Sequence, residues 1–314
     1  MQGDKLKKQR ELKLTTYRNG RIIMQDAYNA IGQTEKAARI RACGTYLKID
    51  ECSDGSEHLH TASSCHVRLC QICSKRWAWK ALEQLSKVVG YMEQDHQYRW
   101  IFITLSFRNC GGADLVQDVD HHMDAIHRFE KYLAYKRAFI GSFRKLEIRH
   151  DFKRLRSGYN THFHILAAVE PDYFTGPDYL SQGKLVEMWQ KAGKVDYTPH
   201  VWVEAVKLQG EQIQNDKALL EVSKYVTKSS DYIAPEKMRN WEALTKEAVF
   251  YIDAALANRR LIGRMGEIRR VHKLLNLSDD PMSEIDSDGE IDLAVVTLSH
   301  VFKWDFDAKD YLEF

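Results

Sequence analysis

Two histidines and a glutamate have the types and spacing of a metal site. His162 and His164 lie in 162–169, a run whose composition predicts a β-strand. Side chains alternate along a strand, so both imidazoles project from the same face. Glu147 lies in the preceding predicted strand, 143–150, where a buried carboxylate is costly unless it is paired or bound to metal. These three side chains could bind Mn²⁺ or Mg²⁺, with positions left open for a phosphate oxygen and water. An exposed Glu147 on a polar face is the alternative.

A tyrosine in a predicted helix, 211–228, has the neighbours that a nucleophile needs. Glu221, Tyr225 and Lys228 are four and three residues apart, so they share one face of the helix. A phenol with a pKa of about 10 needs a nearby cation, such as Lys228, to attack a phosphodiester. That attack would leave a 5′-phosphotyrosyl bond and a free 3′-OH, and Glu221 could later act as general base. The alternative is a tyrosine that packs in the core, as most tyrosines in amphipathic helices do. The catalytic interpretation of Tyr225 therefore depends on its combination with the histidine pair.

The cysteines indicate a second, structural metal site. Cys65, Cys70 and Cys73 offer three thiolates with spacing typical of tetrahedral Zn²⁺, and Cys43 is the predicted fourth ligand. Three residues are alternatives to Cys43 as the fourth ligand: Cys52, His60 and His66. Reduced buried thiols without zinc are the alternative for the whole cluster.

The charge distribution favours a polyanionic partner. The net charge is only +2, but residues 276–314 contain eleven acids against two lysines, so the remainder carries about +11. Basic side chains concentrate at 136–156, although a solvated charged face would look the same. The predicted DNA-binding residues are Arg144, Lys145, Arg149, Arg154 and, in the tyrosine helix, Lys224.

Strand and helix patterns alternate along the middle of the chain. Strands are predicted at 99–107, 143–150, 162–169 and 200–206. Helices are predicted at about 76–93, 115–140, 178–192, 211–228 and 239–275. This alternation allows either a parallel sheet or an antiparallel, split βαβ sheet. A short β-hairpin is predicted at 293–306. No apolar run is long enough to cross a membrane and the start is too charged for a secretory signal, so we expect a cytoplasmic protein.

Six segments follow from these patterns. They are an N-terminal extension (1–42), a cysteine-rich zinc element with a helix (43–95), a core with the candidate nuclease residues (96–235), a basic helical segment (236–275), an acidic linker (276–292) and a C-terminal segment (293–314).

The motifs together resemble the replication initiators of rolling-circle plasmids from Gram-positive bacteria, which belong to the HUH endonuclease superfamily. The similar segments, which lie within residues 40–270, are FITLS at 102–106, Glu147, HFHIL at 162–166, EVSKYVTK at 221–228 and CHVRLCQICSKRWAWK at 65–80. The family often has a histidine and a proline just before the metal pair, where this chain has Asn160 and Thr161.

The resemblance implies an α+β fold with a central antiparallel sheet, flanking helices and a small zinc-binding element. It implies that Glu147, His162 and His164 hold the catalytic metal and that Tyr225 nicks DNA at a double-strand origin. It also implies that Glu221 supports hydrolysis or strand transfer at termination. The expected partners are origin DNA, a host polymerase and helicase, and a second copy of the chain. A transposase or mobilisation relaxase is the alternative within this chemistry, and a zinc-containing DNA-binding repressor is the non-enzymatic one.

Overall fold

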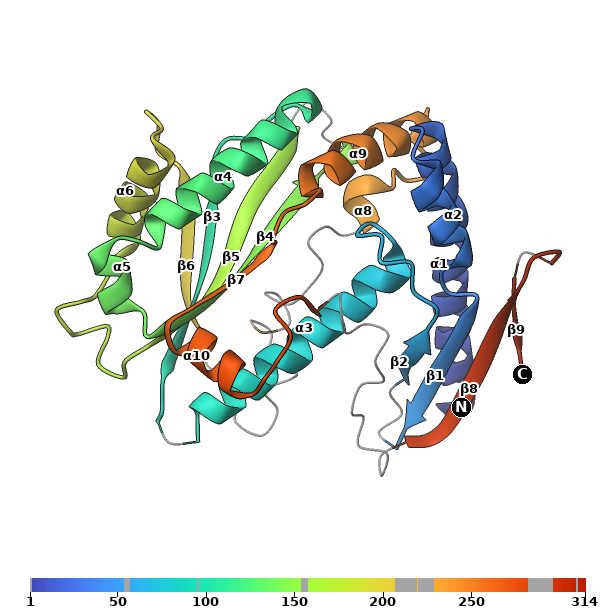
Figure 1. The fold of residues 1–314 in the computed structure, drawn as a ribbon, viewed down its shortest axis with the longest axis horizontal. Coiled ribbons are helices and arrows are strands. Elements are labelled where there is room, and N and C mark those ends of the chain that lie inside the picture. The colour runs from blue at the N-terminus through green and yellow to red at the C-terminus, as the bar shows by residue number, and fades with distance from the viewer. Residues whose placement is uncertain are drawn as a thin grey trace. The chain divides into compact units, whose positions relative to one another are not determined.

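The computed structural model describes residues 2–53, 57–94, 96–153, 158–206, 219, 229–281, 296–308 and 310–314. Within it, the chain forms two compact units, each built around an antiparallel sheet. The predicted α+β class, with a central antiparallel sheet and flanking helices, is confirmed (Figure 1). None of the described helices combines the length and apolarity that a membrane crossing needs.

The first unit comprises Met1–Lys80, Arg239–Phe250 and Asp280–Phe314. Its sheet has the order β2-β1-β8-β9. The strands are β1 (Tyr46–Cys52), β2 (Glu57–Ala62), β8 (Val296–Asp305) and β9 (Asp310–Glu313). The helices are α1 (Gln2–Ala30), α2 (Thr34–Ala42), the start of α3 (Gln71–Met92) and the start of α9 (Trp241–Leu256). The C-terminal strands thus join a sheet begun near residue 46, because β8 pairs along the whole of β1.

Two sequence predictions for this unit need correction. The pattern at 293–306 predicts a hairpin, but 296–305 is one strand, and the hairpin is formed with β9. The pattern at 1–40 gives no clear element, yet α1 and α2 fill it. A mixed pattern still folds as helix here because α1 and α2 pack on each other and bury Met24, Tyr28 and Ile40.

The second unit comprises Ala81–Met238 and Tyr251–Asp279. Its five strands have the order β6-β3-β5-β4-β7, and every neighbouring pair is antiparallel. The strands are β3 (Arg99–Ser106), β4 (Gly141–His150), β5 (Tyr159–Val169), β6 (His200–Val206) and β7 (Ile262–Met265). The helical elements are η1 (Gly112–Asp114), α4 (Leu115–Phe129), α5 (Leu133–Ala138), α6 (Gln182–Gly193), α8 (Ser229–Tyr232) and α10 (Gly266–Leu274), together with the ends of α3 and α9.

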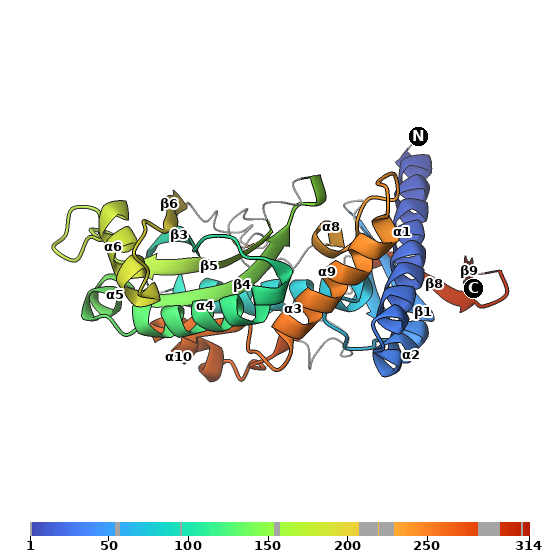
Figure 2. The same cartoon turned by 90° about the horizontal axis from the view of Figure 1, so that it is seen from above.

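Helices α4 and α6 pack over one face of this sheet (Figure 2). Phe163 and Ile165 of β5 point to that face and are fully buried. Trp189 of α6 packs against both α4 and the end of β3. The centroid of its ring lies 4.5 Å from that of Phe107, which follows β3, and 5.6 Å from that of Phe129 in α4. A continuous apolar run such as that of β5 is typical of a central strand covered on both sides.

Among the described residues, α3 contacts part of the other face. At the end of the sheet where β3 begins, Trp100 donates a hydrogen bond to Glu93, which follows α3, and Arg264 of β7 donates one to Gln84 of α3. The histidines 162 and 164 lie toward the other end of this face.

Two helix predictions in this unit also need correction. The segment 239–275 is not all helical, because 262–265 forms β7 on the edge of β4. Edge pairing of this kind is a tertiary effect that local pattern cannot show. The helix predicted at 115–140 is interrupted between α4 and α5.

Candidate functional site

The two histidines and Glu147 meet on one face of the second unit's sheet. In the pairing of β4 with β5, Glu147 lies opposite His162 and Lys145 lies opposite His164. Residues two apart share a face, so all three candidate ligands point the same way. All three are buried, with Glu147 only 1% exposed.

The ligand atoms converge on one point. Nε2 of His164 lies 2.8 Å and Nε2 of His162 lies 3.2 Å from Oε2 of Glu147, and the two Nε2 atoms are 3.1 Å apart. Ligands about 2.1 Å from an octahedral ion and at right angles to each other lie about 3.0 Å apart. The three atoms therefore fit one triangular face of an octahedral site, and the described residues supply no further ligand to it.

The electrostatics of the triad also fit a cation. Oε1 of Glu147 is buried and has no hydrogen-bond partner among the described residues. Burial alone would raise the pKa of Glu147, but hydrogen bonds from His162 and His164 and the charge of Lys145 hold it well below its ordinary value. Burial lowers the pKa of His164, so its imidazole is held neutral, as a metal ligand must be. The donor set suits a divalent ion that accepts both nitrogen and oxygen ligands.

The second nitrogen of each imidazole is also held. Nδ1 of His164 lies 3.1 Å from Oγ1 of Thr104 on β3, and Nδ1 of His162 lies 3.4 Å from the backbone oxygen of Asn160. Such outer contacts fix the ring orientation and leave Nε2 as the ligand. The sequence predicted a strand at 99–107 and a family motif within it, but it did not identify Thr104 as the contact. The contact to His162 comes from the backbone oxygen of residue 160. It therefore does not depend on the side chain at that position, where this chain departs from the family pattern.

The predicted DNA-binding residues fall in different places. Lys145 and Arg149 lie on the triad face, but Lys145 is fully buried and only Arg149 is exposed. Arg144 lies on the opposite, helix-covered face, where its Nε donates a 2.6 Å hydrogen bond to Oε1 of buried Glu130. Because the Arg144 guanidinium is buried in this ion pair, we do not expect it to contact DNA. Arg154 lies outside the described residues.

A cavity of about 500 Å³ opens beside the triad on the same face. Arg149 and Asn160, which pair across β4 and β5 one step beyond Glu147 and His162, line it together with Lys153 and Asn109. Nδ2 of Asn160 donates a 2.8 Å hydrogen bond to Oδ1 of Asn109. Two carboxylates, Asp151 and Asp231, also line the cavity, and Asp231 belongs to α8, which follows the tyrosine motif closely in sequence. Next to the candidate metal site the cavity thus offers two cations that can contact phosphate and two amides that can contact a sugar or base.

The tyrosine motif itself lies outside the described residues. Glu221, Lys224, Tyr225 and Lys228 therefore stay predictions from the sequence. The structure resumes with α8 at Ser229, and α8 packs against β4, the strand that carries Glu147.

Four thiols form a separate cluster in the first unit. Cys43 follows α2, Cys65 and Cys70 precede α3, and Cys73 lies in the first turn of α3. Their sulfurs lie 3.5 Å (Cys43 to Cys70), 3.6 Å (Cys43 to Cys73) and 3.7 Å (Cys65 to Cys73) apart. Four sulfurs about 2.3 Å from a tetrahedral Zn²⁺ would be about 3.8 Å apart, so the donor set fits a zinc ion.

The thiol pKa values reflect this crowding. Hydrogen bonding with Cys65 raises the pKa of Cys43, and hydrogen bonding with Cys43 raises that of Cys70 and lowers that of Cys73. The four cannot all be thiolates without a cation between them. Of the alternative fourth ligands, His60 is engaged elsewhere, since its Nδ1 lies 2.5 Å from Asp50.

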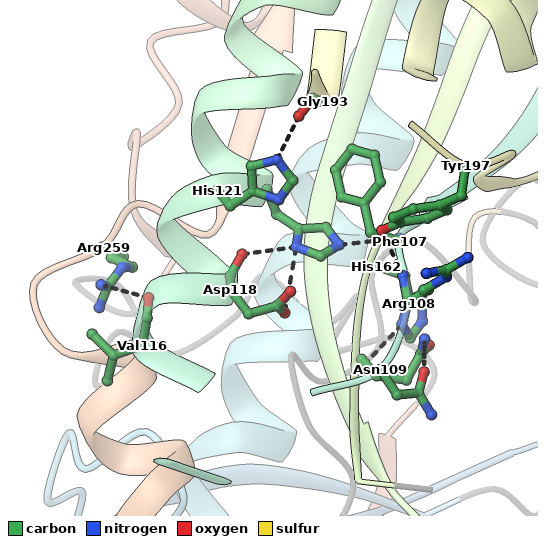
Figure 3. Close-up of polar contacts among 12 residues, drawn as sticks. Phe107, Arg108, Asn109, Val116, Asp118, His121, His162, Gly193, Tyr197 and Arg259 are labelled. Atoms are coloured by element: carbon green, nitrogen blue, oxygen red, sulfur yellow. Dashed lines mark hydrogen bonds and ion pairs between the residues drawn. The ribbon is translucent and has the colours of Figure 1, made fainter. Parts of the chain in front are cut away.

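A third group of metal-ligand types, Asp118, His121 and His122, lies on α4 (Figure 3). The histidines already make protein contacts: Nε2 of His121 lies 2.7 Å from the Gly193 oxygen, and Nδ1 of His122 lies 2.8 Å from the Asp118 backbone oxygen. Nε2 of His122 accepts a hydrogen bond from the Phe107 amide at 3.4 Å. With both ring nitrogens engaged, His122 is better suited to joining α4 to the end of β3 than to binding a metal.

Fold and site together define an α+β protein with a two-histidine, one-carboxylate group on an antiparallel sheet and a four-thiol cluster in a second unit. The model of a family described as replication protein, Rep_1, matches residues 56–312. The chain therefore belongs to this family, the Rep proteins of rolling-circle plasmids.

Known relatives agree with this assignment. A "Protein rep" of a Bacillus species is 35% identical over 258 residues, which cover 78% of this chain and 82% of the relative. A "Protein rep" of Bacillus amyloliquefaciens is 34% identical over 258 residues, or 78% of this chain and 74% of the relative. That of Lactiplantibacillus plantarum is 29% identical over 295 residues, or 90% of each. No solved structure matches the chain.

Proposed function

We propose that the chain binds the double-strand origin of its plasmid and nicks one DNA strand through a covalent 5′-phosphotyrosine intermediate. The observation that carries the proposal is the convergence of Glu147, His162 and His164 in a member of a replication protein family. An ion with only three protein ligands keeps coordination positions for a phosphate oxygen and water, which suits phosphate chemistry.

Glu147, His162 and His164 would hold the catalytic ion, and their two imidazoles favour Mn²⁺ over Mg²⁺. Such an ion, when bound, polarises the scissile phosphate and stabilises negative charge on it. Buried Lys145 acts on Glu147 rather than on DNA, since its charge adds to the hydrogen bonds from His162 and His164 that lower the pKa of that carboxylate. Exposed Arg149 and Lys153 would bind phosphates that flank the cut.

The nucleophile is the phenol of Tyr225. Its oxygen bonds to phosphorus as the bond from phosphorus to the 3′ oxygen breaks, and the phenolic proton passes to that 3′ oxygen in the net reaction. The resulting 3′-OH serves as primer for a host polymerase. Lys228 favours the phenolate, Lys224 contacts the backbone and Glu221 activates the second acceptor at termination. These four assignments rest on the sequence motif alone.

The four-thiol cluster would hold a structural Zn²⁺ through Cys43, Cys65, Cys70 and Cys73. A host helicase and a second copy of the chain are further expected partners, which follow from the family resemblance. A transposase or relaxase would share the same chemistry and would differ in cutting transposon ends or a transfer origin.

The proposal is tested with end-labelled, single-stranded origin DNA, Mn²⁺ and a denaturing gel. With the label at the 3′ end of the DNA, the wild type should give a labelled fragment joined to the protein through its 5′ phosphate, and Tyr225→Phe should give none. Tyr179→Phe is the matched control, because Tyr179 is 46% exposed and packs against Tyr173 away from the triad. A wild type that binds the DNA but never cuts it, with any divalent metal, would instead indicate a non-enzymatic repressor.

A further inference from the structure

An exposed tryptophan stands in the same row of the sheet as a candidate metal ligand. Trp202 of the edge strand β6 lies opposite Thr104 of β3, and Thr104 lies opposite His164 of β5. Cross-strand partners point to the same face, so Trp202 and His164 share the triad face. Trp202 is 53% exposed although it is the largest apolar side chain on that strand.

The tryptophan is close enough to serve the same DNA strand as the triad. Neighbouring strands lie about 4.8 Å apart, so two strand spacings put the backbones of Trp202 and His164 about 10 Å apart. Thr104 stands between them, and its hydroxyl is held by Nδ1 of His164. Only a short side chain therefore separates the indole from the imidazole along this row.

The surroundings of Trp202 favour a nucleobase over an apolar protein partner. Protein-docking surfaces are usually contiguous apolar patches, whereas the neighbours of Trp202 on the same face of β6 are His200 and Glu204, both exposed. A flat aromatic ring among polar groups is the usual platform for an unpaired base. The charge of Glu204 repels phosphate, so the DNA backbone should pass on the side of His200, which lies in the row of Ser106 and His162.

We propose that Trp202 is the stacking platform for an unpaired base next to the scissile phosphate, and so positions the single strand on the triad. The inference rests on the proposed nicking function and adds to it a contact outside the metal and tyrosine motifs. As a positioning residue, Trp202 acts on how the strand is bound and not on the phosphate itself.

The first test is binding of a fluorescent, single-stranded origin oligonucleotide without added Mn²⁺ or Mg²⁺, so that binding is measured apart from cleavage and structural zinc is kept. Trp202→Ala should weaken binding by about 5- to 100-fold, the usual range for loss of one stacked base. Trp202→Phe should keep most of the affinity, and Tyr179→Ala, which removes an exposed aromatic elsewhere in the same unit, should bind like the wild type. Unchanged melting of each variant shows that folding is intact. Wild-type affinity of Trp202→Ala, or a Trp202→Phe as weak as Trp202→Ala, overturns the proposal.

The second test locates the stacked base. A single abasic site is moved through the positions around the nick, and affinity is measured for the wild type and Trp202→Ala. One position next to the nick should weaken wild-type binding and leave Trp202→Ala unaffected, because contacting groups are not additive. Equal effects in both proteins at every position would overturn the proposal. Nicking by the wild type in Mn²⁺ is measured alongside. If the wild type nicks, equal effects reject only the stacking role of Trp202; if it does not nick, the proposed nicking function is rejected as well.

Discussion

Glu147 and His162 face each other as a cross-strand pair of β4 and β5, with Oε2 of the carboxylate 3.2 Å from Nε2 of the imidazole. A shift of one residue in this register would turn Glu147 to the helix-covered face and leave the histidines without a carboxylate. The register of this one hairpin therefore decides whether a metal site exists.

Loss of one imidazole should separate metal binding from DNA binding. His162→Ala should reduce Mn²⁺ affinity by more than the roughly 10- to 100-fold caused by losing an outer contact, and should abolish nicking. Duplex affinity should stay nearly unchanged, because other side chains bind the phosphates. Calorimetric Mn²⁺ titration and a gel-shift assay measure the two effects. His121→Ala, a histidine in the same unit but outside the triad, is the control; joint loss of metal and duplex binding in His162→Ala would indicate a structural histidine.

The hydroxyl of Thr104 should matter through His164. Thr104→Val keeps the shape of the side chain but removes the hydrogen-bond partner of Nδ1. We expect Mn²⁺ affinity to fall by about 10- to 100-fold, and Thr104→Ser to restore most of it. If valine is tolerated without loss of affinity, the contact does not orient the ring.

In the metal-free protein, His164 should take up a proton at a lower pH than an ordinary histidine. Burial lowers the pKa of His164, whereas an ordinary histidine has a pKa of about 6.5. The unfolded chain thus takes up this proton at higher pH than the folded chain, so His164 protonation lowers the free energy of unfolding as the pH falls through about 6.5. NMR titration of the imidazole measures the pKa directly. A midpoint above that of a free histidine would contradict the burial seen here.

The four-thiol cluster should contain zinc. Elemental analysis of the purified protein should give about one equivalent, and Cys73→Ser should lose it with a fall in Tm of about 10 °C or more, since structural zinc contributes to folding. Cys110→Ser is the matched control, because Cys110 lies in the other unit and outside the cluster. Zinc-free wild-type protein of undiminished stability would favour reduced, buried thiols.

The ligand types were predictable from the sequence, but their contacts were not. Strand alternation alone puts His162 and His164 on one face, whereas the pairing of Glu147 with His162 depends on the hairpin between β4 and β5. The same alternation could have shown that Arg144 does not face the metal site. It is three residues from Glu147 in the same strand, so it must point to the opposite side of the sheet.

The order of the strands in the sheet could not be predicted from the sequence, because it depends on contacts between distant segments. The four residues of β7 are too short to show a period and become a strand only by pairing with β4. The neighbours of Trp202 across the sheet likewise depend on strand order, which periodicity does not encode.

The most direct test of the central claim is the identity of the residue joined to DNA. The covalent adduct formed with single-stranded origin DNA and Mn²⁺ is digested with trypsin and nuclease, and the nucleotide-bearing peptide is sequenced by mass spectrometry. We predict one modified residue, Tyr225, linked to a 5′ phosphate, and no adduct when His162 and His164 are replaced by alanine. A link to another residue, or an adduct that forms equally well without both histidines, would contradict the account.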